Sequence, residues 1–237
     1  MSLQNFVHDS IINERLKITS KSKPLQKVQP ATKAELAVLI KEEVNKQGPD
    51  ADLNFIDTSL ITDMSCLFEK LDIRNIKIDQ WNTSNVTKMH CTFLNCHEFV
   101  GDGLDTWDTS NVTDMISMFG GCKNLNTDLS GWDVSNVTDM ISMFAGCKKF
   151  EGNGLENWNT SKVAWMPTMF LNCAEFNADI SRWNTSNVRD MTSMFRGCTS
   201  LEQDLSGLDI QKAAPNRKWM FKDCPKMKMK MKPTVKI

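Results

Sequence analysis

One motif returns along this chain every 25 or 26 residues. Its most regular position is usually a tryptophan, and the series is Ile56, Trp81, Trp107, Trp132, Trp158, Trp183 and Leu208. A unit this short cannot enclose its own apolar side, so neighbouring units must cover one another and share one continuous core. Residues 56–224 are therefore predicted to form seven stacked units.

Within each unit the apolar residues keep their places. The third unit shows the pattern with Val112, Met115 and Phe119, followed by Cys122 and Leu125. Because the same positions are apolar in the neighbouring units, each of these columns is predicted to become a stacked ladder of side chains.

The course of the chain inside a unit is predicted from local patterns. Residues 129–134 suit a short extended stretch, because β-branched and aromatic residues favour strands. Met140, Met143 and Phe144 follow the i, i+3, i+4 spacing of one or two helical turns, which Gly146 would close. The predicted fold class is a leucine-rich-repeat-like solenoid, with short parallel β-strands plus a short helix in each coil.

The segment before the repeats carries helix signals. Thr32 and Glu35 form a capping box, and Gly48 is a stop signal. Residues 32–55 are therefore predicted to be an N-terminal capping helix and its connection. Residues 1–31 are predicted to be a flexible or weakly helical segment.

The C-terminal segment, residues 225–237, is rich in lysine. Met227, Met229 and Met231 alternate with lysines, so the methionines could pack on the last coil while the lysines face water. Lysine on an exposed strand edge also blocks pairing with another molecule. A basic edge strand or tail is the preferred interpretation, with a contact to nucleic acid or anionic lipid as the alternative.

The repeated motif W-[DN]-T-S-N-V-T-D-M-x-x-M-F-x-x-C-x-x-[FL] resembles the bacterial BspA-like leucine-rich repeat surface-protein family, which is also found in mycoplasma surface lipoproteins. The resemblance covers residues 56–224. It implies a curved solenoid without catalysis or cofactor, used for adhesion or protein binding at a cell surface. The chain shows no export signal or lipoprotein cysteine near its start, so the sequence itself favours a cytoplasmic location.

Composition narrows the possible functions. A formal net charge of −1 argues against a general electrostatic grip on nucleic acid, and no apolar run approaches the length of a membrane span. None of the three histidines lies in a nucleophile motif, and no glycine-rich phosphate loop is present. The sequence therefore predicts no enzymatic activity, no cofactor, no nucleic-acid partner and no membrane span.

The cysteines follow the repeat rather than a disulfide or zinc pattern. One column comprises Cys96, Cys122, Cys147, Cys173 and Cys198. Small apolar residues in a tight corner need no chemistry, so buried, reduced thiols are predicted. His90, Cys91 and His97 lie near Cys96, but their spacing does not fit a zinc site, and no metal is predicted.

A polar column follows the tryptophan position and is the first candidate for partner binding. It includes Asp108, Asp133, Asn159 and Asn184. These side chains could form a hydrogen-bonding strip on an outer face, or they could shape turns and solubilise that face. The turn-shaping interpretation is favoured.

One unit departs from the motif at several positions and supplies the second candidate. Lys162 replaces the usual Asn, Trp165 replaces the usual Asp, and Pro167 follows Met166. Trp165 is therefore predicted to be exposed, and exposed tryptophan is enriched at interaction hot spots. Drift of the repeat, with Trp165 packed partly on its neighbours, is the alternative.

These observations together predict a monomeric, non-enzymatic binding module that contacts a protein partner, or adheres to one, through its outer faces. The alternative is an intracellular structural scaffold without a dedicated ligand. An outer face whose charge varies between units would favour binding, whereas a uniform face would favour the scaffold.

Overall fold

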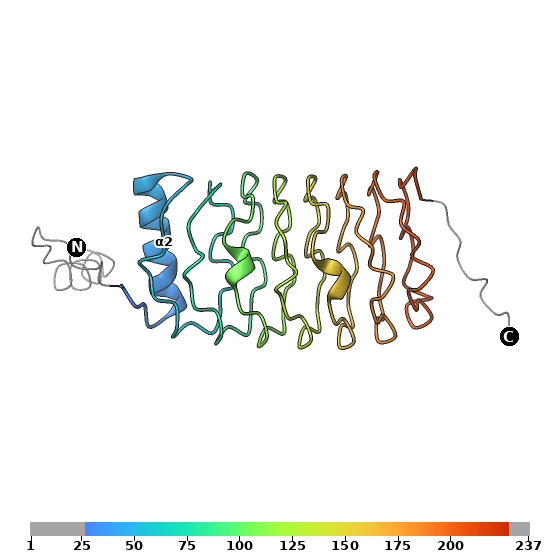
Figure 1. Ribbon diagram of the computed structural model, residues 1–237, viewed down its shortest axis with the longest axis horizontal. Coiled ribbons are helices and arrows are strands. Elements are labelled where there is room, and N and C mark those ends of the chain that lie inside the picture. The colour runs from blue at the N-terminus through green and yellow to red at the C-terminus, as the bar shows by residue number, and fades with distance from the viewer. Residues whose placement is uncertain (1–26, 228–237) are drawn as a thin grey trace, which may run out of the picture.

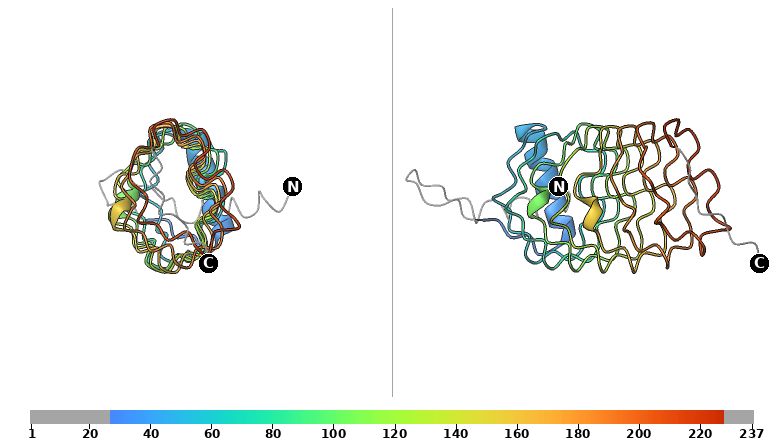
Figure 2. Two further views of the ribbon diagram at one scale, coloured as in Figure 1. Left: turned by 90° about the vertical axis from the view of Figure 1, so that its right-hand side faces the viewer. Right: turned by 45° about the vertical axis from the view of Figure 1, so that its right-hand side comes forward.

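The computed structural model describes residues 27–227, which form one long column of stacked coils (Figure 1). Its regular elements are the helix α2 (Lys33–Gln47) and two short 3-10 helices, η1 (Leu104–Thr106) and η2 (Leu155–Asn157). α2 lies at the N-terminal end of the column. Viewed along the column, the coils superimpose as an oval ring, with η1 and η2 on the side opposite α2 (Figure 2).

Helix α2 forms where its sequence signals predicted it. The Glu35 amide donates to the Thr32 hydroxyl at 3.2 Å, and Gly48 ends the helix with a left-handed φ of 86°. Leu36 and Ile40 are fully buried against the coils. The helix predicted from the capping box is confirmed.

Backbone hydrogen bonds tie each coil to the next. The third coil donates four amides to the fourth: Met115 N to Asp139 O at 3.2 Å, Ser117 N to Ile141 O at 2.8 Å, Phe119 N to Met143 O at 2.9 Å, and Gly121 N to Ala145 O at 2.7 Å. The same four positions donate in the coils on either side. Every second amide of this segment therefore points along the column rather than around its own coil.

Aromatic rings stack along the inside of the column. The ring centroids of Phe119, Phe144 and Phe170 lie 5.6 Å apart from one to the next, with interplanar angles of 15° and 1°. Trp158 and Trp183 stack with centroids 6.1 Å apart, and each indole N–H donates to a backbone carbonyl. The prediction that equivalent apolar positions form ladders is confirmed.

The predicted leucine-rich-repeat-like solenoid of strands and helices is wrong. Within residues 27–227, parallel pairing occurs only as isolated bridges, such as the one between Asp114 and Asp139, and α2 is the one α-helix. Residues 129–134 do not form a strand either. The coils are built from turns joined by hydrogen bonds to their neighbours.

The backbone of the segment around Met140 and Phe144, which was predicted to be a short helix, explains this difference. Ser142 has a φ of 53° and Gly146 a φ of 80°, and left-handed residues interrupt an α-helix. The Met143 amide donates to Met140 O and closes a turn. The Ser142 amide instead donates to Pro167 O in the next coil. Successive turns bring Met140, Met143 and Phe144 to the same inner side, so they produce the apolar spacing of a helix without being one.

Several sequence predictions lie wholly or partly outside the described residues. These are the flexible or weakly helical segment predicted for residues 1–31, of which residues 1–26 are not described, and the placement of Met229 and Met231. Met227, the last described residue, is partly buried against the core. The proposed boundaries at residues 31, 55 and 224 stay predictions.

Candidate functional site

The polar column predicted as a possible binding strip shapes turns. The Ser110 amide donates to Asp108 Oδ1 at 2.9 Å, and the Ser135 amide donates to Asp133 Oδ1 at 2.8 Å. In the same way, the Ser161 amide donates to Asn159 Oδ1 and the Ser186 amide donates to Asn184 Oδ1, each at 3.2 Å. All four side chains therefore act as turn acceptors, although they lie on exposed residues.

The same contacts favour the ionised form of Asp108. The Ser110 hydroxyl donates to Asp108 at 2.6 Å, and this bond together with the Ser110 amide lowers the pKa of Asp108. The carboxylate is therefore charged at neutral pH. Asn159 and Asn184 accept the same type of bond without a charge, so the turn does not require ionisation.

Lys162 replaces the asparagine at which neighbouring coils are bonded together. Asn136 donates its side-chain amide to Ser110 O at 2.7 Å, and Asn187 does the same to Ser161 O. Lys162 instead donates its Nζ to Asn136 Oδ1 at 2.6 Å. Its ammonium group therefore links two coils and remains exposed.

Trp165 is exposed, as predicted, with 38% of its surface accessible. Its backbone bridges to Asp139 and Asp190, so the side chain occupies a column of mainly acidic residues. Asp139 Oδ1 accepts the Ile141 amide at 3.1 Å, but the equivalent position after Trp165 is Pro167, which has no amide to donate. The coil that has Trp in place of Asp therefore also lacks the backbone amide to which an Asp side chain would bond.

The cysteine column is structural. Cys147 is fully buried and its Sγ donates to Phe119 O at 3.0 Å, and Cys122 repeats this contact with Phe93 O. Burial raises the pKa of both thiols well above the ordinary value, so both remain protonated at neutral pH. Their position explains their spacing without disulfide or metal chemistry.

The local cluster of histidine and cysteine also has hydrogen-bond partners. His90 Nδ1 lies 2.9 Å from Ser65 Oγ and 3.4 Å from Asp114 Oδ2, and His97 Nδ1 lies 2.8 Å from Gly121 O. In the part of the chain that the structure describes, no group of three or more His, Cys, Asp or Glu side chains could hold a metal ion.

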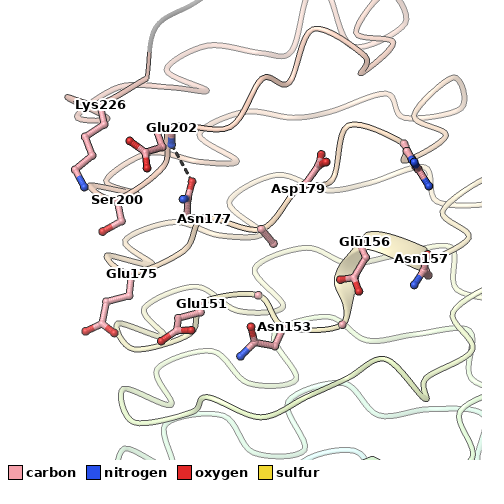
Figure 3. Close-up of a pocket in the computed structure, with 14 residues that line it drawn as sticks. Glu151, Asn153, Glu156, Asn157, Glu175, Asn177, Asp179, Ser200, Glu202 and Lys226 are labelled. Atoms are coloured by element: carbon pink, nitrogen blue, oxygen red, sulfur yellow. Dashed lines mark hydrogen bonds between the residues drawn. The ribbon is translucent and has the colours of Figure 1, made fainter.

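A hollow of about 820 Å³ opens on the outer surface and is lined by residues from four successive coils (Figure 3). We call it the acidic hollow. Its lining residues are Glu151, Gly152, Asn153, Gly154, Glu156, Asn157, Glu175, Asn177, Ala178, Asp179, Arg182, Ser200, Glu202 and Lys226. None of the residues predicted as partner contacts lines it.

Local backbone geometry creates one wall of the acidic hollow. Gly152 and Gly154 have left-handed φ values of 93° and 84°, and η2 follows them directly. A Cβ at Gly152 would lie 2.7 Å from Ala178 Cβ, and a Cβ at Gly154 would lie 2.2 Å from Ser130 N. Only glycine therefore allows this segment to approach the neighbouring coils so closely.

Hydrogen bonds between coils hold the floor of the hollow. The Glu202 amide donates to Asn177 Oδ1 at 3.0 Å, as Figure 3 shows, and the Asn177 amide donates to Glu151 O at 3.2 Å. These bonds fix the backbone and leave the carboxylates of Glu151 and Glu202 exposed. The side chains therefore extend from a fixed base.

The charge of the hollow is mainly negative. Five carboxylate side chains line it, from Glu151, Glu156, Glu175, Asp179 and Glu202, against the two basic residues Arg182 and Lys226. The Ser181 hydroxyl and amide lower the pKa of Asp179, so this group is ionised at neutral pH. Among residues 27–227, the four glutamates form no ion pair.

This site was not predicted from the sequence, because its acidic residues lie in the least regular part of each unit. The only available signals were Gly152 and Gly154 in a unit with one extra residue, and the equivalent residues Glu151 and Glu202, between which the intervening unit has Asn177. Such a pattern gains meaning only when the coils are stacked.

Taken together, the columns of equivalent contacts define a repeat protein in which one coil supports the next. The chain belongs to the family described as Mycoplasma protein of unknown function, DUF285, whose model matches residues 41–153 and again residues 121–234. The two matches share residues 121–153, which is consistent with a family model that spans several repeat units. The match supports a mycoplasma-type repeat family and does not extend to BspA-like leucine-rich repeats.

No curated protein and no solved structure matches this chain significantly. Over residues 27–227, no helix has both the length and the apolar character needed to cross a membrane.

Proposed function

We propose that this chain is a non-enzymatic protein-binding module whose contact surface is the acidic hollow. The observation that carries the proposal is the excess of carboxylates over basic residues in a hollow of about 820 Å³. The partner would present a short segment rich in lysine or arginine, because opposite charges attract most strongly where several of them converge.

The size of the hollow suits a short peptide segment. Its carboxylates come from three successive coils, and coils joined by backbone hydrogen bonds lie about 4.8 Å apart. The first and third coils are therefore about 10 Å apart, which is the length of roughly three residues of extended chain. Two basic residues three positions apart in an extended segment could therefore contact the outer pair of coils together.

The variation of charge along the outer surface favours binding over a purely structural scaffold. Glu175, Ser200 and Lys226 all line the hollow but come from successive coils, so the surface is not uniform. The turn-forming column that contains Asp108 and Asp133 is, by contrast, nearly uniform and is explained by folding. That column alone would fit the alternative of a scaffold without a dedicated ligand.

Adhesion would be one use of the same surface if the chain is displayed outside the cell. The negative hollow and the exposed Trp165 would then be the contacts available to a partner. Either location leaves the proposed chemistry unchanged, because the contact is made by carboxylates on a rigid repeat.

The test is the binding of fluorescein-labelled hexalysine, followed by fluorescence polarisation at low and high salt. The triple variant Glu151→Gln, Glu175→Gln and Glu202→Gln should bind about tenfold more weakly, since three exposed ion pairs contribute roughly 0.5 kcal/mol each. Added salt should weaken binding to the unmodified chain for the same reason.

A matched control removes three exposed carboxylates from another place. Asp102 precedes η1 and Asp105 lies within it, as Asn153 precedes η2 and Glu156 lies within it, and Asp72 is also exposed. The variant Asp72→Asn, Asp102→Asn and Asp105→Asn should retain most of the binding. Equal weakening in both triple variants, or no binding by the unmodified chain, would contradict the proposal and favour the scaffold.

A further inference from the structure

Two cysteines lie on the outside of the column and have no role in the core. Cys66 is exposed and Cys91 is partly exposed, and both have a left-handed backbone, with φ values of 60° and 54°. They occupy the same position in the first and second coils. The later coils place Ser117, Ser142, Thr168, Ser193 and Trp219 there.

Backbone bonds hold the two cysteines side by side. Cys66 N donates to His90 O at 3.0 Å, and Met64 N donates to Lys88 O at 2.9 Å, which fixes the register of the two coils. A coil spacing of about 4.8 Å falls inside the Cα separation of about 4.4–6.8 Å found in disulfides. The thiols are also close enough for each to influence the pKa of the other.

The remaining thiols differ from this pair. Cys96, Cys122, Cys147, Cys173, Cys198 and Cys224 each donate from Sγ to the carbonyl of a phenylalanine in the preceding coil. All but Cys224 are fully buried. The hydrogen bonds occupy the inner thiols, and burial keeps reagents away from all of them except Cys224.

We propose that Cys66 and Cys91 form a dithiol modification site that reacts with low-molecular-weight disulfides to give a disulfide between the first two coils. The Cys66 thiolate attacks a disulfide RSSR, forms a mixed disulfide and releases one RS⁻. The Cys91 thiolate then attacks the Cys66 sulfur and releases the second RS⁻. Two protein thiols are oxidised and RSSR is reduced to two RSH.

The surroundings of the pair set the order and the pace of these steps. Burial raises the pKa of Cys91 to about 11. Burial and the Glu69 carboxylate also raise the pKa of the more exposed Cys66, and Lys33 partly opposes that rise. Cys66 is therefore the thiol that meets the reagent first. Because the thiolate is the attacking species, the reaction should accelerate as the pH rises.

The experiment treats the reduced full-length chain with glutathione disulfide under native conditions and follows intact mass and peptide maps. The expected product has lost two hydrogen atoms and contains a bond between Cys66 and Cys91, while the inner cysteines stay reduced. The variant Cys91→Ser should stop at a glutathione adduct on Cys66, and Cys66→Ser should react more slowly.

Both variants are expected to fold, because serine already occupies the same position in later coils, at Ser117, Ser142 and Ser193. Unchanged circular dichroism would confirm that they are folded. A lasting glutathione adduct on Cys66 of the unmodified chain, without the internal bond, would overturn the proposal. A bond mapped to any other pair, or no reaction at all, would overturn it as well.

Discussion

At the scale of single residues, the coils depend on left-handed backbone at fixed positions. One of these positions carries Gly121, Gly146 and Gly197 in three coils, but Lys70 and Asn95 in the first two. A non-glycine residue in this conformation loses roughly 1–2 kcal/mol to steric strain, and asparagine tolerates it better than lysine. Lys70 therefore carries strain that the equivalent glycines avoid.

Replacing Lys70 with glycine should raise the free energy of unfolding by about 0.5–1 kcal/mol, because relief of strain outweighs the added freedom of the unfolded chain. The exposed ion pair that Lys70 forms with Glu69 contributes little. Chemical denaturation of the two chains measures the difference.

The reverse change provides the control. In Gly121→Ala the new Cβ would meet Asn95 Oδ1 at 2.5 Å and the backbone φ of 79° would be strained, so stability should fall by roughly 1–2 kcal/mol. Similar stabilities for both variants would show that left-handed strain does not govern these positions.

At the scale of the turn, Trp165 and Pro167 behave as a pair. Asp114, Asp139 and Asp190 each accept the amide two residues ahead, at 3.0, 3.1 and 2.8 Å. An aspartate at position 165 would have no such amide to accept. It would also add a negative charge beside Asp139, whose pKa is already raised by burial. The geometry of the turn therefore explains why Trp165 replaces aspartate, and it does so no less well than a contact with a partner would.

The variant Trp165→Asp should therefore be destabilised, whereas adding Pro167→Ile should restore the turn seen at Asp139 and Ile141. We expect a coupling energy of about 1 kcal/mol in favour of the double variant, the typical contribution of one hydrogen bond. A double-mutant cycle of denaturation measurements determines it. Strict additivity of the two single changes would show that the residues are independent.

At the scale of the whole molecule, stability passes from coil to coil. Phe144 is fully buried between Phe119 and Phe170, while Phe221 lies at the end of the ladder and contacts Phe195 with centroids 5.4 Å apart. A repeat protein is stabilised by each unit and its nearest interfaces, so a central break removes two interfaces and a terminal break removes one.

Phe144→Ala should lower the free energy of unfolding by about 3–5 kcal/mol, because it leaves a large cavity in a packed ladder. Phe221→Ala should have a clearly smaller effect, since that side chain is only partly buried. Urea unfolding followed by tryptophan fluorescence compares them, and a second transition is expected for Phe144→Ala as the two halves separate. Equal losses would argue against stabilisation between nearest neighbours.

The acidic hollow also belongs to this largest scale. Glu151, Glu175 and Glu202 are separated by a full unit or nearly so in sequence, and only stacking brings them to one surface. No single unit contains the site. Each residue is recognisable in the sequence as polar and exposed, but which coils meet at the hollow depends on how they stack.

The sequence by itself determined the period, the apolar columns and the helix before the repeats. The spacing of residues such as Phe119 and Phe144 requires each unit to bury the next, and the Thr32 cap needs only local bonds. The tertiary structure alone decided the path inside each coil. An apolar spacing of i, i+3, i+4 fits both a helix and consecutive turns, and the choice depends on whether amides such as that of Ser142 bond within the coil or to the next one.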